Sequence, residues 1–139
     1  HSLAEEDSIM RKVVIAALTA AALLPMQSSA DPNVEDFDLR TAEDLVDLCA
    51  VRDGDPMVES ARGFCYGFLT GAGNYHRAVT AGKDSQPLFC LPEPKMSRAE
   101  AAHLFVSWGR ANPRHLKEAP IDGLIRFAVA TWPCKQAKP

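Results

Sequence analysis

The feature that most constrains the fold is residues 55–82, DPMVESARGFCYGFLTGAGNYHRAVTAG, because this stretch has the pattern of one long helix. Asp55 is a good N-cap, Pro56 suits the first helical position, and Gly82 suits a left-handed stop. Apolar residues recur at helical spacing and predict one wide apolar face: Met57, Ala61, Phe64, Cys65, Phe68, Ala72, Tyr75 and Val79.

A second stripe on the same helix consists of small residues, among them Gly63, Gly67 and Gly71. Each glycine inside a helix costs about 0.8–1 kcal/mol relative to alanine, so these three and Gly73 together cost roughly 3–4 kcal/mol. A neighbouring helix lying close against the stripe would recover dispersion contacts. We therefore predict helix packing at Gly63, Gly67 and Gly71, made either by another helix of this chain or by a second subunit in a homodimer.

The first thirty residues have the parts of a secretory signal peptide. Met10, Arg11 and Lys12 precede the apolar run VVIAALTAAALLPM, and small residues follow in QSSA, with Ser28 and Ala30 fitting the positions before a cleavage site. We read residues 1–30 as an upstream extension and signal peptide, and residues 31–139 as a single exported helical domain. The apolar run is too short for a convincing membrane span, although an uncleaved anchor is the alternative.

The cysteines all lie in the part predicted to be exported: Cys49, Cys65, Cys90 and Cys134. An even number of cysteines in an oxidising compartment favours two disulfides. Free thiols or a metal site are the alternatives, but the chain has no CxxC and no histidine spacing that completes a zinc set. We expect no metal and no cofactor.

Charge is distributed unevenly along the chain. Residues 31–59 hold ten acidic residues against Arg40 and Arg52, whereas residues 60–139 hold eleven basic residues against five acidic ones. Pairing within the chain explains this pattern better than an acidic arm that binds a partner. The small net charge of residues 31–139 argues against nucleic acid as a partner.

Three further helices are predicted around the long one. Thr41 caps a first helix, with Asp44 in place of the usual capping-box glutamate. Ser97 and Glu100 form a capping box for a third helix, and a fourth begins near Pro120. Residues 31–39 read as an extended arm, and the three prolines of KDSQPLFCLPEPK exclude a regular helix there. No segment alternates like a strand. The predicted fold is all-α, a small disulfide-linked bundle of about four helices.

Helix order favours one disulfide pairing over the other two. In an antiparallel helix pair the end of one helix lies beside the start of the next, which places Cys49 near Cys65. By the same argument Cys90, just ahead of the third helix, lies near Cys134, just beyond the fourth. We predict Cys49–Cys65 and Cys90–Cys134.

The sequence offers no catalytic set. It contains neither GxSxG nor HExxH, and the glycines of GFCYGFLTGAG lie within a helix, where they cannot cradle a phosphate. His76 and His103 fall on or near exposed helix faces, and His115 falls in a loop. We predict that the chain is not an enzyme.

The segments DLVDLC, GFCYGFLTGAG, FCLPEPKMSRAE, ANPRHLKEAP and FAVATWPC, in this order and spacing, resemble the Rap/Tai family. These are periplasmic immunity proteins against peptidoglycan amidases delivered by type VI secretion, and the resemblance covers Thr41 to Cys134. It implies a small, often dimeric helical protein that occludes the active-site groove of a cognate amidase and performs no chemistry itself.

In a protein of this kind two loops are the expected contact surfaces, because exposed loops held by a disulfide and prolines are preorganised for binding. They carry the candidate partner-binding residues Lys83, Asp84, Gln86, Leu88, Arg114, His115 and Lys117. Taken by themselves, the basic residues around 110–117 fit a solvated loop near a helix C-terminus better than a surface for an acidic partner. A periplasmic acid-stress chaperone and a structural envelope protein are the alternative functions.

Overall fold

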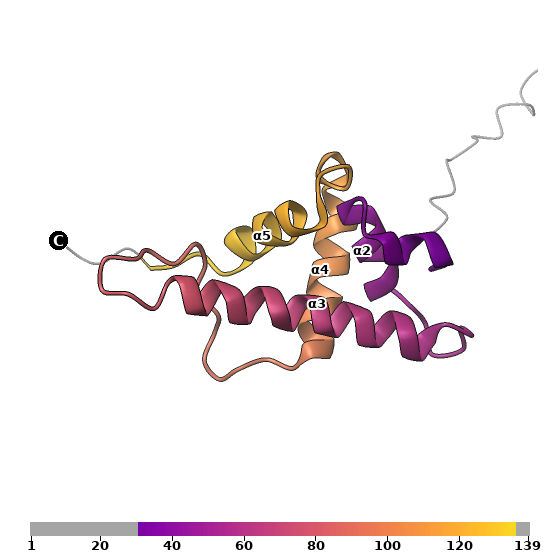
Figure 1. Ribbon diagram of the computed structural model, residues 1–139, viewed down its shortest axis with the longest axis horizontal. Coiled ribbons are helices and arrows are strands. Elements are labelled where there is room, and N and C mark those ends of the chain that lie inside the picture. The colour runs from indigo at the N-terminus through magenta and orange to yellow at the C-terminus, as the bar shows by residue number, and fades with distance from the viewer. Residues whose placement is uncertain (1–30, 136–139) are drawn as a thin grey trace, which may run out of the picture.

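The computed structural model describes residues 31–135 and has helices but no strand in that range (Figure 1). The elements are η1 (Val34–Asp38), α2 (Ala42–Cys49), α3 (Val58–Val79), α4 (Arg98–Ala111), η2 (Pro113–His115) and α5 (Pro120–Thr131). The all-α prediction is confirmed. The signal peptide predicted in residues 1–30 lies outside the described residues.

The short helix α2 occupies the centre of the packing. It contacts η1, α3, α4 and α5, while α3 runs along the long axis of the molecule and α4 crosses it (Figure 1). The core draws side chains from α2, α4 and α5 together with one loop residue: Leu45, Val46, Phe89, Phe105, Val106, Leu124, Phe127 and Ala128. The fold therefore depends on how closely α4 and α5 approach α2.

Helix starts follow the predicted capping chemistry in part. Ser97 and Glu100 form the capping box of α4, with the Glu100 carboxylate accepting the Ser97 N–H at 2.7 Å. Thr41 caps α2 by accepting the Asp44 N–H at 3.3 Å, but the Asp44 carboxylate accepts from the N–H of Arg40 instead of closing a box.

The long helix is shorter than predicted at both ends. It begins at Val58, because residues 53–57 form turns in which the Asp55 carboxylate accepts the Met57 N–H at 2.7 Å. It ends at Val79, where the Thr80 hydroxyl donates to the His76 carbonyl at 2.8 Å. Gly82 lies beyond the helix, and no glycine among the described residues has a positive φ, so the predicted left-handed stop was wrong.

The predicted extended arm was also wrong. Residues Val34–Asp38 form a 3₁₀ helix, because Asn33 and Asp36 satisfy each other's backbone N–H groups in a capping box. The ring of Phe37 then packs edge-on against Phe64 of α3, with centroids 5.4 Å apart. This contact attaches the N-terminal segment to the bundle.

Both predicted disulfides are present. Cys49–Cys65 joins the last residue of α2 to α3, and Cys90–Cys134 joins the segment before α4 to the segment just after α5, each with an S–S distance of 2.07 Å. The second bridge is reinforced by the Cys90 N–H, which donates to the Trp132 carbonyl at 2.8 Å.

The apolar face and the glycine stripe of α3 differ from expectation. Tyr75 and Val79 are exposed, because α3 extends past the helices that would cover them. A Cβ atom added at Gly63, Gly67 or Gly71 would meet nothing within 4 Å. Within residues 31–135, therefore, no helix packs closely against these glycines, and contact with a second chain stays a prediction.

Candidate partner-binding surface

The connection between α4 and α5 holds a charged network built on the predicted residues. His115 Nδ1 lies 2.8 Å from Glu118 Oε1, and Arg126 Nε donates to Glu118 Oε2 at 2.6 Å. Arg114 Nε donates to His115 Nε2 at 3.2 Å, so the neutral ring with its proton on Nδ1 satisfies both contacts. Hydrogen bonds from His115 and Arg126 hold the pKa of Glu118 below its ordinary value. The network therefore keeps Glu118 ionised.

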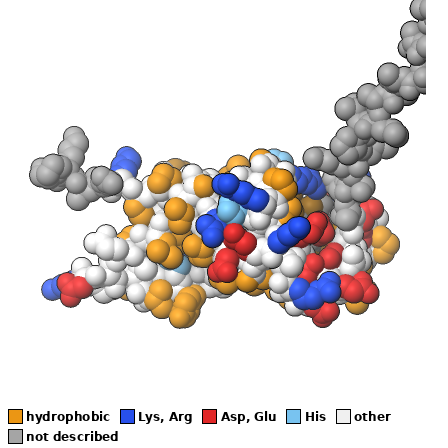
Figure 2. Space-filling model, turned by 90° about the horizontal axis from the view of Figure 1, so that it is seen from above, with side chains coloured by type: hydrophobic (Ala, Val, Ile, Leu, Met, Phe, Trp, Pro, Cys, Tyr) orange, Lys and Arg blue, Asp and Glu red, His pale blue; other side chains and the backbone are white. Residues whose placement is uncertain are grey.

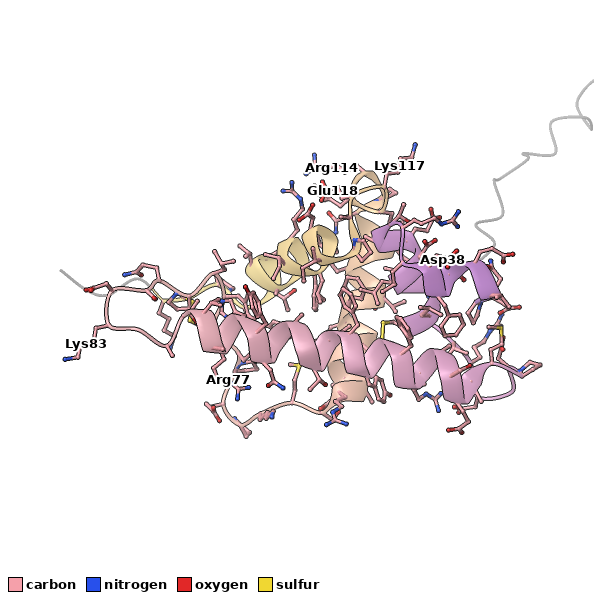
Figure 3. All side chains as sticks on the ribbon, viewed as in Figure 1. Asp38, Arg77, Lys83, Arg114, Lys117 and Glu118 are labelled. Atoms are coloured by element: carbon pink, nitrogen blue, oxygen red, sulfur yellow. A yellow bond between two sulfur atoms is a disulfide. The ribbon has the colours of Figure 1, made fainter. Side chains whose placement is uncertain are left out.

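The same connection is fixed to the body of the molecule. The indole of Trp108 stacks on His115, and the Glu118 and Leu116 carbonyls accept the first N–H groups of α2, from Ala42 and Glu43, at 2.8 and 2.9 Å. These carbonyls satisfy N–H groups that a helix start otherwise leaves open. Arg114 and Lys117 remain exposed on an ordered base (Figure 3).

The loop after α3 is held by a histidine that the sequence placed on or near an exposed face. His76 is buried, because the loop folds back over it: Nε2 accepts the Leu88 N–H at 3.0 Å, and the ring stacks on Phe89 with centroids 4.0 Å apart. Together with the Cys90–Cys134 bridge, these contacts fix the base of the loop. Its predicted binding residues are all exposed: Lys83, Asp84, Gln86 and Leu88.

The two loops do not form one surface. Figure 3 shows Lys83 beyond the C-terminal end of α3, whereas Arg114 and Lys117 lie on the far side of α5 from α3. Arg114, His115 and Lys117 are brought together; Lys83, Asp84, Gln86 and Leu88 form a separate group. A single partner reaching both would have to span α5.

A third feature, which sequence reasoning missed, is an apolar groove of about 160 Å³. We define it by its wall residues Leu69, Ala72, Phe89, Leu91, Ile125 and Trp132, with Arg77, Lys95 and Arg98 also lining it. The available signal was a proline-rich segment with two apolar residues, Leu91 and Met96, close to basic ones. The groove joins three segments distant in sequence, so local patterns could not predict it.

The opposite end of the molecule is acidic. Figure 2 shows acidic side chains gathered at the end that holds η1 and α2. There, burial raises the pKa of Asp47 to about 7, with further contributions from the charges of Asp36, Glu43 and Asp44, while Arg110 opposes the shift. Arg52 pairs with Asp31 and Arg62 with Asp53, both at 2.7 Å, so part of this acidic charge is compensated within the chain.

The structure also shows how the cysteines and the possible metal ligands are placed. All four cysteines are in disulfides, and residues 31–135 contain no group of three side chains placed to hold a metal ion. Among the same residues, no helix is both long and apolar enough to cross a bilayer.

A family model described as Rap1a immunity proteins matches residues 41–134, well over half of the chain. The matched range begins at Thr41, which caps α2, and ends at Cys134, so it includes both disulfides. No curated protein and no solved structure matches the chain.

Proposed function

This chain belongs to the family of Rap1a immunity proteins, and from that membership we propose that it neutralises a peptidoglycan amidase delivered by type VI secretion. As an immunity protein it is not an enzyme, and its partner is a cognate effector protein. In this proposal it binds the amidase in the periplasm and occludes the active-site groove. The observation that carries the proposal is the family match across all four α-helices and both disulfides.

The proposed compartment is supported by the disulfides. Two bridges are typical of an oxidising environment such as the periplasm. We propose that residues 1–30 are an upstream extension and a signal peptide, and that residues 31–139 act as one mature domain. Blocking export of the full-length chain would then leave the cysteines reduced.

We propose the α4–α5 connection as the main contact surface, with Arg114, His115 and Lys117 facing the amidase. This proposal is supported by the ordered conformation of the loop. The hydrogen bonds of His115 and Glu118 hold the loop before binding, so little conformational entropy is lost on association. The loop carrying Lys83, Asp84, Gln86 and Leu88 is proposed as a second contact, held at its base by His76.

A homodimer is proposed through Gly63, Gly67 and Gly71. No described residue lies within 4 Å of a Cβ atom at these positions, so a second chain has room to pack closely against them. Light scattering of the oxidised protein at increasing concentration should show a dimer that Gly67→Leu dissociates. A Gly67→Leu variant that dimerises like the wild type would refute this interface.

The acid-stress chaperone is the weaker reading. Such a protein would have to open when the pH falls, yet the raised pKa of Asp47 means that protonation of this carboxyl favours the folded state. Nothing in residues 31–135 favours a structural envelope role over binding.

The test is capture of the partner by residues 31–139, with both bridges oxidised, from a periplasmic extract at neutral and at acid pH. One dominant peptidoglycan amidase at neutral pH is the expected result. The combined variant Lys83→Ala, Gln86→Ala and Arg114→Ala should lose it, whereas Glu59→Ala, on exposed α3 surface, should retain it. Many unrelated proteins bound only in acid would support the chaperone and overturn the proposal.

A further inference from the structure

The apolar groove has the size of a single side chain. Its volume of about 160 Å³ is close to that of an engineered cavity that takes up one benzene ring, and well below the roughly 300–1,000 Å³ of pockets that enclose larger ligands. Its walls come from the C-terminal half of α3, from residues 89–98 and from α5. An aromatic ring or a branched aliphatic group fits this space.

The groove is preformed. On one side, the disulfide Cys90–Cys134 and the hydrogen bond between Cys90 N–H and the Trp132 carbonyl join the segment to the end of α5. Phe89 stacks on His76, which attaches the same segment to α3. At its other end, the segment leads directly into the capping box of α4. An incoming group therefore enters an ordered site.

Three cations line the groove without a carboxylate partner. Arg77, Lys95 and Arg98 form no ion pair with any described residue, whereas Arg40, Arg52, Arg62 and Arg126 each do. Arg77 makes only a 3.4 Å contact with the Asn74 side chain. The nearby Glu100 carboxylate is already bound to Ser97, and Glu93 is exposed without an ion pair. The lining therefore offers several positive charges to a ligand.

We propose that this groove binds an acidic segment of the effector protein, with one aromatic or branched aliphatic side chain inserted between α3 and α5 and flanking carboxylates on Arg77, Lys95 and Arg98. A protein segment fits better than a fatty acid, because the space holds one side chain and three separate cations call for more than one carboxylate. The proposal rests on the proposed function for the identity of the partner, but not for the chemistry of the groove.

Gly73 provides a specific way to fill the groove. Gly73 lines the groove, and a Cβ atom added there meets nothing within 4 Å. A leucine side chain at this position therefore enters open space without a clash. Gly73→Ala is the matched control, since it adds the same helix propensity and leaves the groove open. Both variants should melt no lower than the wild type.

The first probe is the acetylated peptide DEEFEED, followed by amide NMR shifts of the oxidised protein. We expect saturable shifts at groove residues, weakened at least about ten-fold by Gly73→Leu and by Lys95→Glu with Arg98→Glu. Gly73→Ala and Arg110→Glu, a charge reversal at an exposed residue outside the groove, should bind as the wild type does, and the peptide DEEAEED should bind more weakly. Absence of shifts, or shifts spread over the surface, would overturn the proposal.

The captured amidase separates this inference from the proposed function. If the wild type binds the amidase and Gly73→Leu binds it equally well, the groove inference fails and the immunity function stands. If the wild type binds no amidase, the proposed function fails, and the peptide titration alone tests whether the groove binds acidic segments. Two other outcomes would overturn the inference by assigning the groove to another occupant. The first is binding of dodecanoate without binding of the peptide. The second is a wild-type dimer that Gly73→Leu dissociates and Gly67→Leu does not.

Discussion

The glycines of α4 and α5 and those of α3 stand in opposite environments. A Cβ at Gly109 would lie 2.8 Å from Val46 Cγ2, and one at Gly123 would lie 2.5 Å from Ala42 Cβ. The four glycines of α3 would meet nothing within 4 Å. Close packing therefore occurs where single glycines meet α2, while the repeated glycines that suggested it lie open. A run of glycines in a helix permits close packing of another helix on that face. Whether a helix of the same chain packs there depends on the tertiary fold.

The largest expected effect is at the tightest contact. Gly123→Ala forces α5 away from α2, because the new methyl group meets another Cβ that cannot rotate aside. We expect a loss of about 3 kcal/mol in the free energy of unfolding, measured by urea denaturation. Adding Ala42→Gly should recover part of this loss by removing the atom that clashes. An unchanged unfolding midpoint for Gly123→Ala would show that α2 and α5 are not this close.

Gly109→Ala should have a smaller effect of the same sign. The atom it meets is the end of the Val46 side chain, which can shift, so we expect a loss of about 1–2 kcal/mol. In a double-mutant cycle, Val46→Ala should reduce the effect of Gly109→Ala. Additive effects of the two substitutions would contradict the contact.

Asp47→Asn tests the burial of the Asp47 side chain on α2 through the pH dependence of stability. The pKa of Asp47 rises from 3.8 to about 7 on folding, mainly because of burial, so between these values the folded chain keeps a proton that the unfolded chain has lost. The contribution of the Asp47 carboxyl to the free energy of unfolding is therefore greatest in acid. It falls as the pH rises to about 7 and stays constant above pH 7. Asp47→Asn should therefore raise Tm more at pH 8 than at pH 4, and Glu43→Gln, which removes one of the charges that raise this pKa, should do so to a smaller extent. An equal gain at both pH values would contradict the burial.

The smallest effect is expected on the open face of α3. In dilute, monomeric protein Gly67→Ala should raise the free energy of unfolding by about 0.8–1 kcal/mol, through helix propensity alone. At concentrations where the proposed dimer forms, the same methyl group should reverse the gain, because it separates the two chains. A loss of stability in the monomer would mean that α3 packs more closely within the chain than the open environment of Gly67 allows.

Local features could be predicted from the sequence, and contacts between distant segments could not. The Ser97–Glu100 capping box and the two disulfides follow from spacing and helix order, so they were predicted correctly. The burial of His76 depends on a loop folding back twelve residues later, which no helical periodicity encodes. The glycine contacts depend on where helices cross.

The candidate site divides in the same way. The residue types of the α4–α5 connection predicted a basic surface, but its hydrogen-bond network includes Arg126 from the following helix. The groove needs α3, α5 and residues 89–98 at once. Sequence therefore predicted candidate loop residues, and the structure showed which of them lie together.

The measurement that tests the central claim most directly is inhibition of the captured amidase. The purified enzyme hydrolyses peptidoglycan stem peptides while oxidised residues 31–139 are added in increasing amounts. We predict that hydrolysis falls to background at one chain per enzyme molecule, and that reducing both disulfides abolishes this inhibition. Full hydrolysis in the presence of excess folded, oxidised chain would contradict the assignment as an amidase immunity protein.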